Sequence, residues 1–124
     1  MTRFPDGEHI HEIKSLRKLR ETIKPKTRRT NRKSMEAIAA DINRTLKGWY
    51  GYFRNAKTSQ LGEIDGWIRM RMRSILRKRN RLKGRGRGRD HQRWPNRYFM
   101  KLGLFCLLEA QATEIASLQK GANH

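Results

Sequence analysis

The segment LGEIDGWIRMRMRSILR, residues Leu61 to Arg77, decides the fold. Its apolar residues Leu61, Ile64, Met72 and Ile75, with either Trp67 or Ile68 between them, recur at three- and four-residue steps. That spacing is typical of a core-facing helix and predicts one over about residues 60–81. No segment shows the period-two alternation of a strand, so we expect an all-α protein, a small bundle of about three to five helices with basic connecting loops.

Two further helices are expected on the N-terminal side. Apolar residues at helical spacing predict a first helix over residues 10–24, which Pro25 ends. Ser34 is a good N-cap for a second helix that reaches about residue 55. Between these helices, residues 24–33 carry six cations in ten positions and form a basic connection.

The C-terminal third combines a basic run with short apolar segments. Residues 83–89 alternate Gly and Arg, a composition that cannot pack a core and predicts disorder in the absence of a ligand. Pro95 suits the first turn of a fourth helix, which Gly103 interrupts. A last helix is expected over residues 107–118, with its end at Gly121.

The charge of the chain points to a polyanionic partner. Thirty Lys and Arg against eleven Asp and Glu give a formal net charge of +19 on 124 residues. Such self-repulsion destabilises a compact monomer unless a polyanion offsets it, so RNA or DNA is the expected partner. The longest wholly apolar run is only residues 104–108, which argues against a membrane partner. No targeting segment is evident at the N-terminus, so a cytoplasmic location is expected.

Candidate contacts to nucleic acid come from four basic clusters. Arginine presents a planar fork to phosphate, and residues four apart on a helix lie about 6 Å from one another. Arg69, Arg73 and Arg77 of the third helix, the one expected over residues 60–81, are four apart and would form such a row of guanidinium groups. Like charges at that spacing repel, so something acidic should face this row. The candidates are Lys26, Arg28, Arg29, Arg32 and Lys33 in the basic connection; Arg69, Arg71, Arg73 and Arg77 on the third helix; Arg85, Arg87 and Arg89 in the Gly/Arg run; and Arg93 with Trp94 beyond it.

Catalytic and metal-binding patterns are not found in the sequence. The four histidines lack the further ligands of a zinc site, and the acids show no aspartate pair for a magnesium ion. The Gly/Arg run lacks the Lys-Ser/Thr ending of a phosphate-binding loop. Cys106, inside an apolar run, is expected to be a buried, inert thiol. We therefore expect no catalytic residue, no metal and no cofactor.

Several motifs resemble one known family. KTRRT at residues 26–30, NRTLKGWYGYFR at 43–54, IDGWIRMRMR at 64–73, RWPNRYF at 93–99 and LGLFCL at 102–107 occur in one order along the chain. In that order they are similar to the maturase-specific domain of group II intron reverse transcriptases. The resemblance covers about residues 14–110. It leaves residues 1–13 as an N-terminal stub and residues 111–124 as a helix end and tail.

The resemblance implies a function in RNA binding. In the family this domain follows the reverse-transcriptase fingers and palm, and its helices form the thumb. It implies binding of group II intron RNA, assistance to its folding for splicing, and a grip on the template–primer duplex. The palm with its Tyr-Ala-Asp-Asp-type motif is absent from this sequence, and nothing after Leu107 resembles a zinc-bearing endonuclease, so no polymerase or nuclease activity is expected.

Three hypotheses follow from the sequence. The first is an RNA-binding maturase-type domain. The second is a thumb subunit that acts in trans with a separate reverse-transcriptase palm polypeptide and contacts an RNA–DNA duplex. The third is a non-specific basic DNA-binding remnant of an intron reading frame, which would bind any duplex equally well at matched salt.

Overall fold

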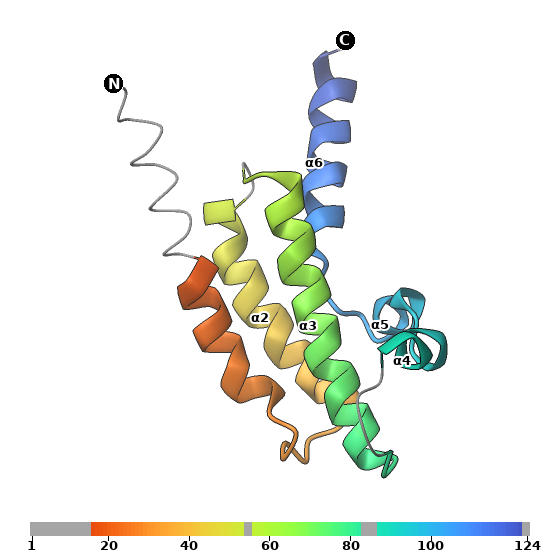
Figure 1. Ribbon diagram of the computed structural model, residues 1–124. Coiled ribbons are helices and arrows are strands. Elements are labelled where there is room, and N and C mark those ends of the chain that lie inside the picture. The colour runs from red at the N-terminus through yellow and green to blue at the C-terminus, as the bar shows by residue number, and fades with distance from the viewer. Residues whose placement is uncertain (1–15, 54–55, 83–86, 123–124) are drawn as a thin grey trace, which may run out of the picture.

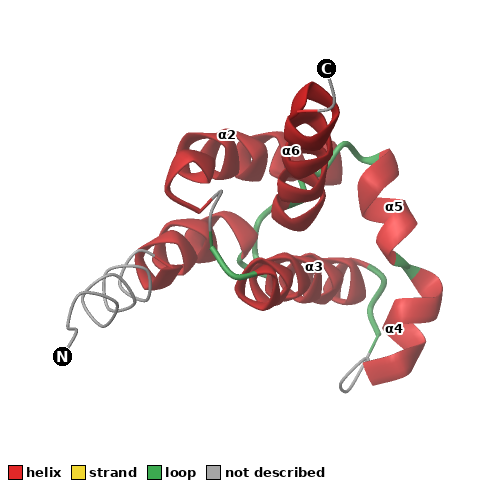
Figure 2. Cartoon of the chain, turned by 90° about the horizontal axis from the view of Figure 1, so that it is seen from above, coloured by secondary structure: helices red, strands yellow, loops and turns green. Residues whose placement is uncertain are grey.

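The fold is all-α, as the sequence predicts. The computed structural model describes residues 16–53, 56–82 and 87–122. Within these ranges every regular element is helical. A helix at residues 16–23, α2 (Met35–Phe53) and α3 (Thr58–Arg79) lie side by side as a bundle, and α6 (Leu107–Ala122) packs against α3 (Figures 1 and 2). No helix of the described residues is long and apolar enough to cross a membrane.

The local signals of the sequence correctly place the end of the first helix and the start of the second, whereas residues 10–15 and 54–55 of the two expected helices lie outside the described part. The N-terminal helix gives way after residue 23 to a 3-10 helix, η1 (Lys24–Thr27), which contains Pro25. Ser34 caps α2 as expected, because its Oγ accepts a hydrogen bond from the Ala37 N–H at 3.1 Å. Both boundaries thus follow from one residue each.

A single apolar core joins the bundle. The apolar stripe on α3 faces those of α2 and the N-terminal helix, and burial of each large side chain contributes about 1.5–3 kcal/mol. Phe99 and Leu107 bring the C-terminal third into the same core. Among its fully buried side chains are Leu19, Ile23, Ile38, Ile42, Leu46, Leu61, Ile64, Ile68, Met72, Ile75 and Phe99.

The C-terminal third is more ordered than the sequence suggests. Helix α4 (Arg87–Arg93) begins inside the Gly/Arg run, so the prediction of disorder is wrong for residues 87–89, whereas residues 83–86 lie outside the described part. The next helix, α5 (Asn96–Lys101), follows Pro95 as predicted and lies with α4 to one side of the bundle (Figure 2). The sequence gives no separate signal for α4.

The connection from α5 to α6 is fixed by hydrogen bonds to the bundle. Gly103 adopts a φ of +85°, which closes α5 in a left-handed turn. The Asn43 side chain on α2 donates to the Gly103 carbonyl at 2.7 Å and accepts from the Phe105 N–H at 2.6 Å. On α3, the buried Asp65 accepts from the Leu107 N–H at 2.9 Å and so caps α6.

Candidate nucleic-acid interface

Exposed cations gather where the turn before α2 meets the end of α3. In Figure 1 this turn and the last residues of α3 lie together at the lower end of the bundle. The cationic side chains of residues 28–33 and of residues 78–81 are exposed. We call this surface the basic end; it comprises Arg28, Arg29, Arg32 and Lys33 from the turn and Lys78, Arg79 and Arg81 from α3 and the residues after it.

Hydrogen bonds from a side chain of α3 to backbone carbonyls of the turn hold the two parts of the basic end together. The Arg79 guanidinium donates to the carbonyl of Asn31 at 2.8 Å and to that of Lys33. The Asn31 amide donates to the Lys26 carbonyl at 2.8 Å, and its oxygen accepts from the Lys33 N–H at 2.9 Å. The cations of the turn are therefore carried on a fixed backbone, as a surface that binds phosphates in register requires.

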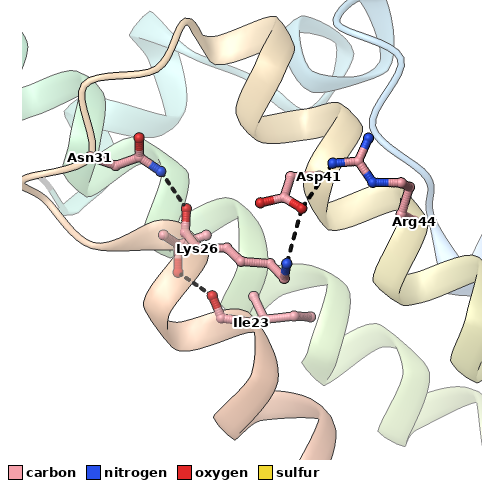
Figure 3. A network of polar contacts seen from close by, with 6 residues as sticks. Ile23, Lys26, Asn31, Asp41 and Arg44 are labelled. Atoms are coloured by element: carbon pink, nitrogen blue, oxygen red, sulfur yellow. Dashed lines mark hydrogen bonds and ion pairs between the residues drawn. The ribbon is translucent and has the colours of Figure 1, made fainter.

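An acidic residue ties the start of this turn to α2 (Figure 3). Asp41 accepts from Lys26 Nζ at 2.9 Å and from Arg44 Nη2 at 3.1 Å. The hydrogen bond from Lys26 is the main cause that lowers the pKa of Asp41, against a smaller opposing effect of burial. Lys26, a predicted phosphate contact, is thus half-buried and engaged by a carboxylate of the protein.

Arg71, another predicted contact, donates hydrogen bonds to residues of η1. Its Nε donates to Thr27 Oγ1 at 2.8 Å, and its Nη2 donates to the Lys24 carbonyl at 3.1 Å. The guanidinium also lies 5.5 Å from the centre of the Trp67 ring, within the range of a cation–π contact. Burial and, to a smaller extent, the neighbouring Arg28 lower the pKa of Arg71.

Arg73 and Arg77 do not present an exposed row, and this part of the sequence prediction is wrong. Arg73 is 4% exposed; it donates to the Trp94 carbonyl at 2.9 Å and lies over the Phe99 ring. Arg77 is 9% exposed and pairs with the buried Asp90 of α4 at 2.9 Å. The acid expected to face the row thus comes from the chain itself. The physical reason is that α4 and α5 cover this side of α3.

We call Arg73, Arg77 and Asp90 the arginine clamp, because they attach α4 and α5 to α3. Besides the Trp94 carbonyl, Arg73 reaches the Asn96 Oδ1 at 3.1 Å, which places one guanidinium across the junction of the two short helices. Burial is the main cause that lowers the pKa of Arg73, with a further contribution from Arg69.

The remaining predicted residues are dispersed. Arg69 is half-buried, and its Nε has no hydrogen-bond partner. Arg89 and Arg93 are exposed on α4, with Arg93 3.6 Å from Asp90. Trp94 is half-buried against the core. Arg85 and the side chain of Arg87 lie outside the described part. Among the described candidates, those of the turn, Arg28, Arg29, Arg32 and Lys33, lie together as an exposed set.

Arg79 and Arg81 belong to the basic end but are missing from the sequence prediction. Arg81 has a φ of 55°, the left-handed conformation that favours glycine at the end of a helix. The hydrogen bonds of a Schellman turn surround it, from the Arg81 N–H to the Lys78 carbonyl and from the Leu82 N–H to the Arg77 carbonyl, each at 3.0 Å. The signal in the sequence was the run of cations at the expected helix end.

Comparison with known families identifies the fold. The group II intron maturase-specific domain matches residues 16–97, which include the bundle, the basic end and the arginine clamp. The chain belongs to this family. It matches no curated protein and no solved structure.

The maturase-specific domain is the part of the chain that carries the candidate interface. The matched residues end within α5, so α6 lies beyond them. Among the described residues, no group of three or more His, Cys, Asp or Glu is arranged to hold a metal ion.

Proposed function

We propose that the chain binds group II intron RNA through its basic end and assists the folding of that RNA for splicing. The family supports an intron RNA as the partner. The observation that carries the proposal is the fixed turn of residues 28–33, where four exposed cations are held by the Arg79 hydrogen bonds. Phosphate contacts from a fixed backbone do not read base edges, but they can recognise a folded RNA by the arrangement of its phosphates. In this proposal the chain is a binding protein and not an enzyme.

Competitive binding at near-physiological salt tests the proposal. A labelled group II intron RNA is incubated with the chain, and unlabelled duplex DNA or an unrelated structured RNA is added in excess. Retention of the intron RNA against both competitors is the expected result. Equal displacement by duplex DNA would instead support the non-specific DNA-binding remnant. Splicing of the same intron RNA at low magnesium, with and without the chain, then tests assistance to folding.

A second candidate function, a thumb that acts in trans with a separate palm polypeptide, is favoured by one surface. An open groove of about 800 Å³ lies between α2, residues 103–106 and α6. It contains the edge-to-face pair of Tyr50 and Phe105, and its charged residues are Glu109, Glu114 and Lys47. Such a surface suits a protein better than a phosphate backbone. Co-purification of a palm-bearing polypeptide with the chain would support this candidate.

A further inference from the structure

A small pocket lies between α3, α5 and the start of α6, away from the basic end. Its volume is about 120 Å³. Apolar walls come from Ile68, Leu104 and Phe105, and open polar groups come from Arg69, Asn96 and Glu109. Asp65 and Cys106 also line the pocket, but the Asp65 carboxylate accepts from the backbone of residues 107 and 108 and from the Cys106 thiol, so both groups are engaged within the protein. A mostly apolar recess with a few polar groups is the usual form of a small-ligand site.

Two residues of this pocket are left unexplained by the packing of the protein. Arg69 Nε is buried without an acceptor, a state that carries a desolvation penalty. Met100 is 58% exposed although it lies at an apolar wall. Arg69 Nε itself is closed to the pocket, but the guanidinium lines it beside Met100. A ligand that offers an acceptor to this guanidinium and a flat apolar face to Met100 suits this wall, because the thioether of methionine packs well against aromatic rings.

The polar groups define the hydrogen-bonding pattern of that ligand. Asn96 Oδ1 already accepts from Arg73, which leaves the Asn96 amide nitrogen as a donor beside the Arg69 guanidinium. Glu109 is exposed and supplies an acceptor. A ring with carbonyl acceptors and an N–H donor on one edge, as in a pyrimidine base, matches this set.

The size of the pocket favours one six-membered ring. The recess, of about 120 Å³, is smaller than the cavity of about 150 Å³ that encloses benzene, so even a single ring would lie partly in its open side and the two rings of a purine would fit less well. Arg97 and Lys101 are exposed one turn apart on α5. Each directly follows a residue that lines the pocket, Asn96 or Met100, so the two cations are placed to hold the phosphates that flank a bound base.

We infer that the pocket binds one unpaired pyrimidine of the RNA, with Arg69 and Asn96 donating to the base and Met100 covering its face. Extruded bases of structured RNA are recognised in this way, by packing together with hydrogen bonds to their edges. The inference rests on the proposed function, since the RNA that binds at the basic end supplies the base.

Two hairpin RNAs test the inference, one with a single bulged uridine and one with an abasic residue at the same position. Both carry the same phosphates, so the basic end does not distinguish them. The intact chain is expected to bind the uridine hairpin about tenfold more tightly at matched salt. A bulged adenosine should bind less tightly than the uridine. Equal affinity for the uridine and abasic hairpins would overturn the inference.

Matched variants assign the effect to the pocket. Met100→Ala should abolish the preference for uridine, whereas Met70→Ala removes an equally exposed methionine of α3, 57% against 58%, and should retain it. Arg69→Met should also abolish the preference, and Arg17→Met removes the same charge from the N-terminal helix as its control. Loss of the preference in Met70→Ala or Arg17→Met would count against the pocket.

Crosslinking of the unmodified chain locates the bound base directly and does not depend on any variant. 4-Thiouridine at the bulge should crosslink to residues 96–109 or to Arg69, and a crosslink confined to residues 28–33 would overturn the inference. The intron competition is run on the same preparation. Retention of intron RNA with equal binding of the two hairpins would reject the pocket alone, whereas loss of retention would reject the proposed function.

Discussion

The basic end and the arginine clamp use the same side chain in opposite ways. Arg28, Arg29 and Arg32 are exposed on a fixed turn, whereas Arg73 and Arg77 are buried against α4 and α5. An exposed guanidinium stays hydrated until a phosphate replaces its water, and a buried one must be satisfied inside the protein. Burial and available acceptors, more than spacing along a helix, therefore decide whether an arginine of this chain can bind RNA.

The two regions also depend on each other through α3. Its side beside α4 and α5 holds Arg73 and Arg77, and its C-terminal end supplies Arg79 to the turn of the basic end. A change in the clamp should therefore alter stability, and a change in the basic end should alter RNA affinity. Variants of the two regions separate the effect on stability from the effect on RNA affinity.

The largest effect is expected for Arg77→Met. This change removes the 2.9 Å partner of the buried Asp90 carboxylate and leaves Arg93 at 3.6 Å, and removal of one partner of a buried pair is strongly destabilising. We expect the free energy of unfolding to fall by about 3 kcal/mol, as measured by urea denaturation. Arg97→Met, at an exposed position of α5, is the control and should change it by less than about 0.5 kcal/mol. If the two variants were equally stable, the buried arginine of the clamp would contribute no more to stability than an exposed arginine does.

The second effect concerns affinity alone. The triple variant Arg28→Gln, Arg29→Gln and Arg32→Gln should retain wild-type stability and lose three phosphate contacts. The slope of log affinity against log salt should then fall by about 2, which corresponds to about hundredfold weaker binding of intron RNA near 0.1 M salt. Filter binding at four salt concentrations measures both quantities.

A triple variant with the same charge loss provides its control. Arg17→Gln, Lys18→Gln and Lys24→Gln remove three exposed cations outside the basic end. If these changes weaken binding as much as those in the turn, net charge and not the fixed turn accounts for affinity.

Arg81→Gly should move stability and affinity in opposite directions. Glycine adopts the φ of 55° without the steric cost that arginine bears, so the free energy of unfolding should rise by about 0.5–1 kcal/mol. Loss of one cation should weaken RNA binding about fivefold near 0.1 M salt. Arg81→Lys retains both the charge and the strain and should change neither quantity. A variant Arg81→Gly with lower stability would show that the left-handed turn carries no strain.

The sequence predicts the bundle well because its signals are local. Ser34 and Pro25 mark helix boundaries through their own backbone chemistry, and the apolar stripe of α3 records which side is buried. The exposed cations of residues 28–33 are likewise predicted from composition. Each of these properties depends on a residue and its neighbours within one or two turns.

Local signals of this kind do not predict the arginine clamp, because its contacts join residues that are far apart in the chain. Arg77 and Asp90 are 13 positions apart, and Arg73 meets the carbonyl of Trp94 across 21 positions. Nothing in a basic helix face shows that two short helices will cover it. An isolated acid inside a long basic run, such as Asp90, is the one feature that could have indicated a buried partner for an arginine.

The smallest effect is expected for Asp41, whose environment lies between those of the two regions. Its side chain is 19% exposed and that of Lys26 is 27% exposed, against 7% and 10% for Asp90 and Arg77. The pKa of Asp41 is lowered below its ordinary value of 3.8, chiefly by the hydrogen bond from Lys26. The ion pair therefore stabilises the folded chain above about pH 5, and this contribution is lost as the pH falls through the lowered pKa.

Asp41→Asn measures that contribution. At pH 6 the wild type should exceed the variant in free energy of unfolding by about 0.5 kcal/mol, as expected for a partly exposed pair, and the difference should shrink at pH 3. The midpoint of urea unfolding at the two pH values gives both numbers. A difference that is the same at pH 3 and pH 6 would mean that the folded chain does not favour the Asp41 carboxylate. A difference as large as that of Arg77→Met would mean that partial exposure does not weaken the pair, and that the contrast between clamp and surface does not depend on burial.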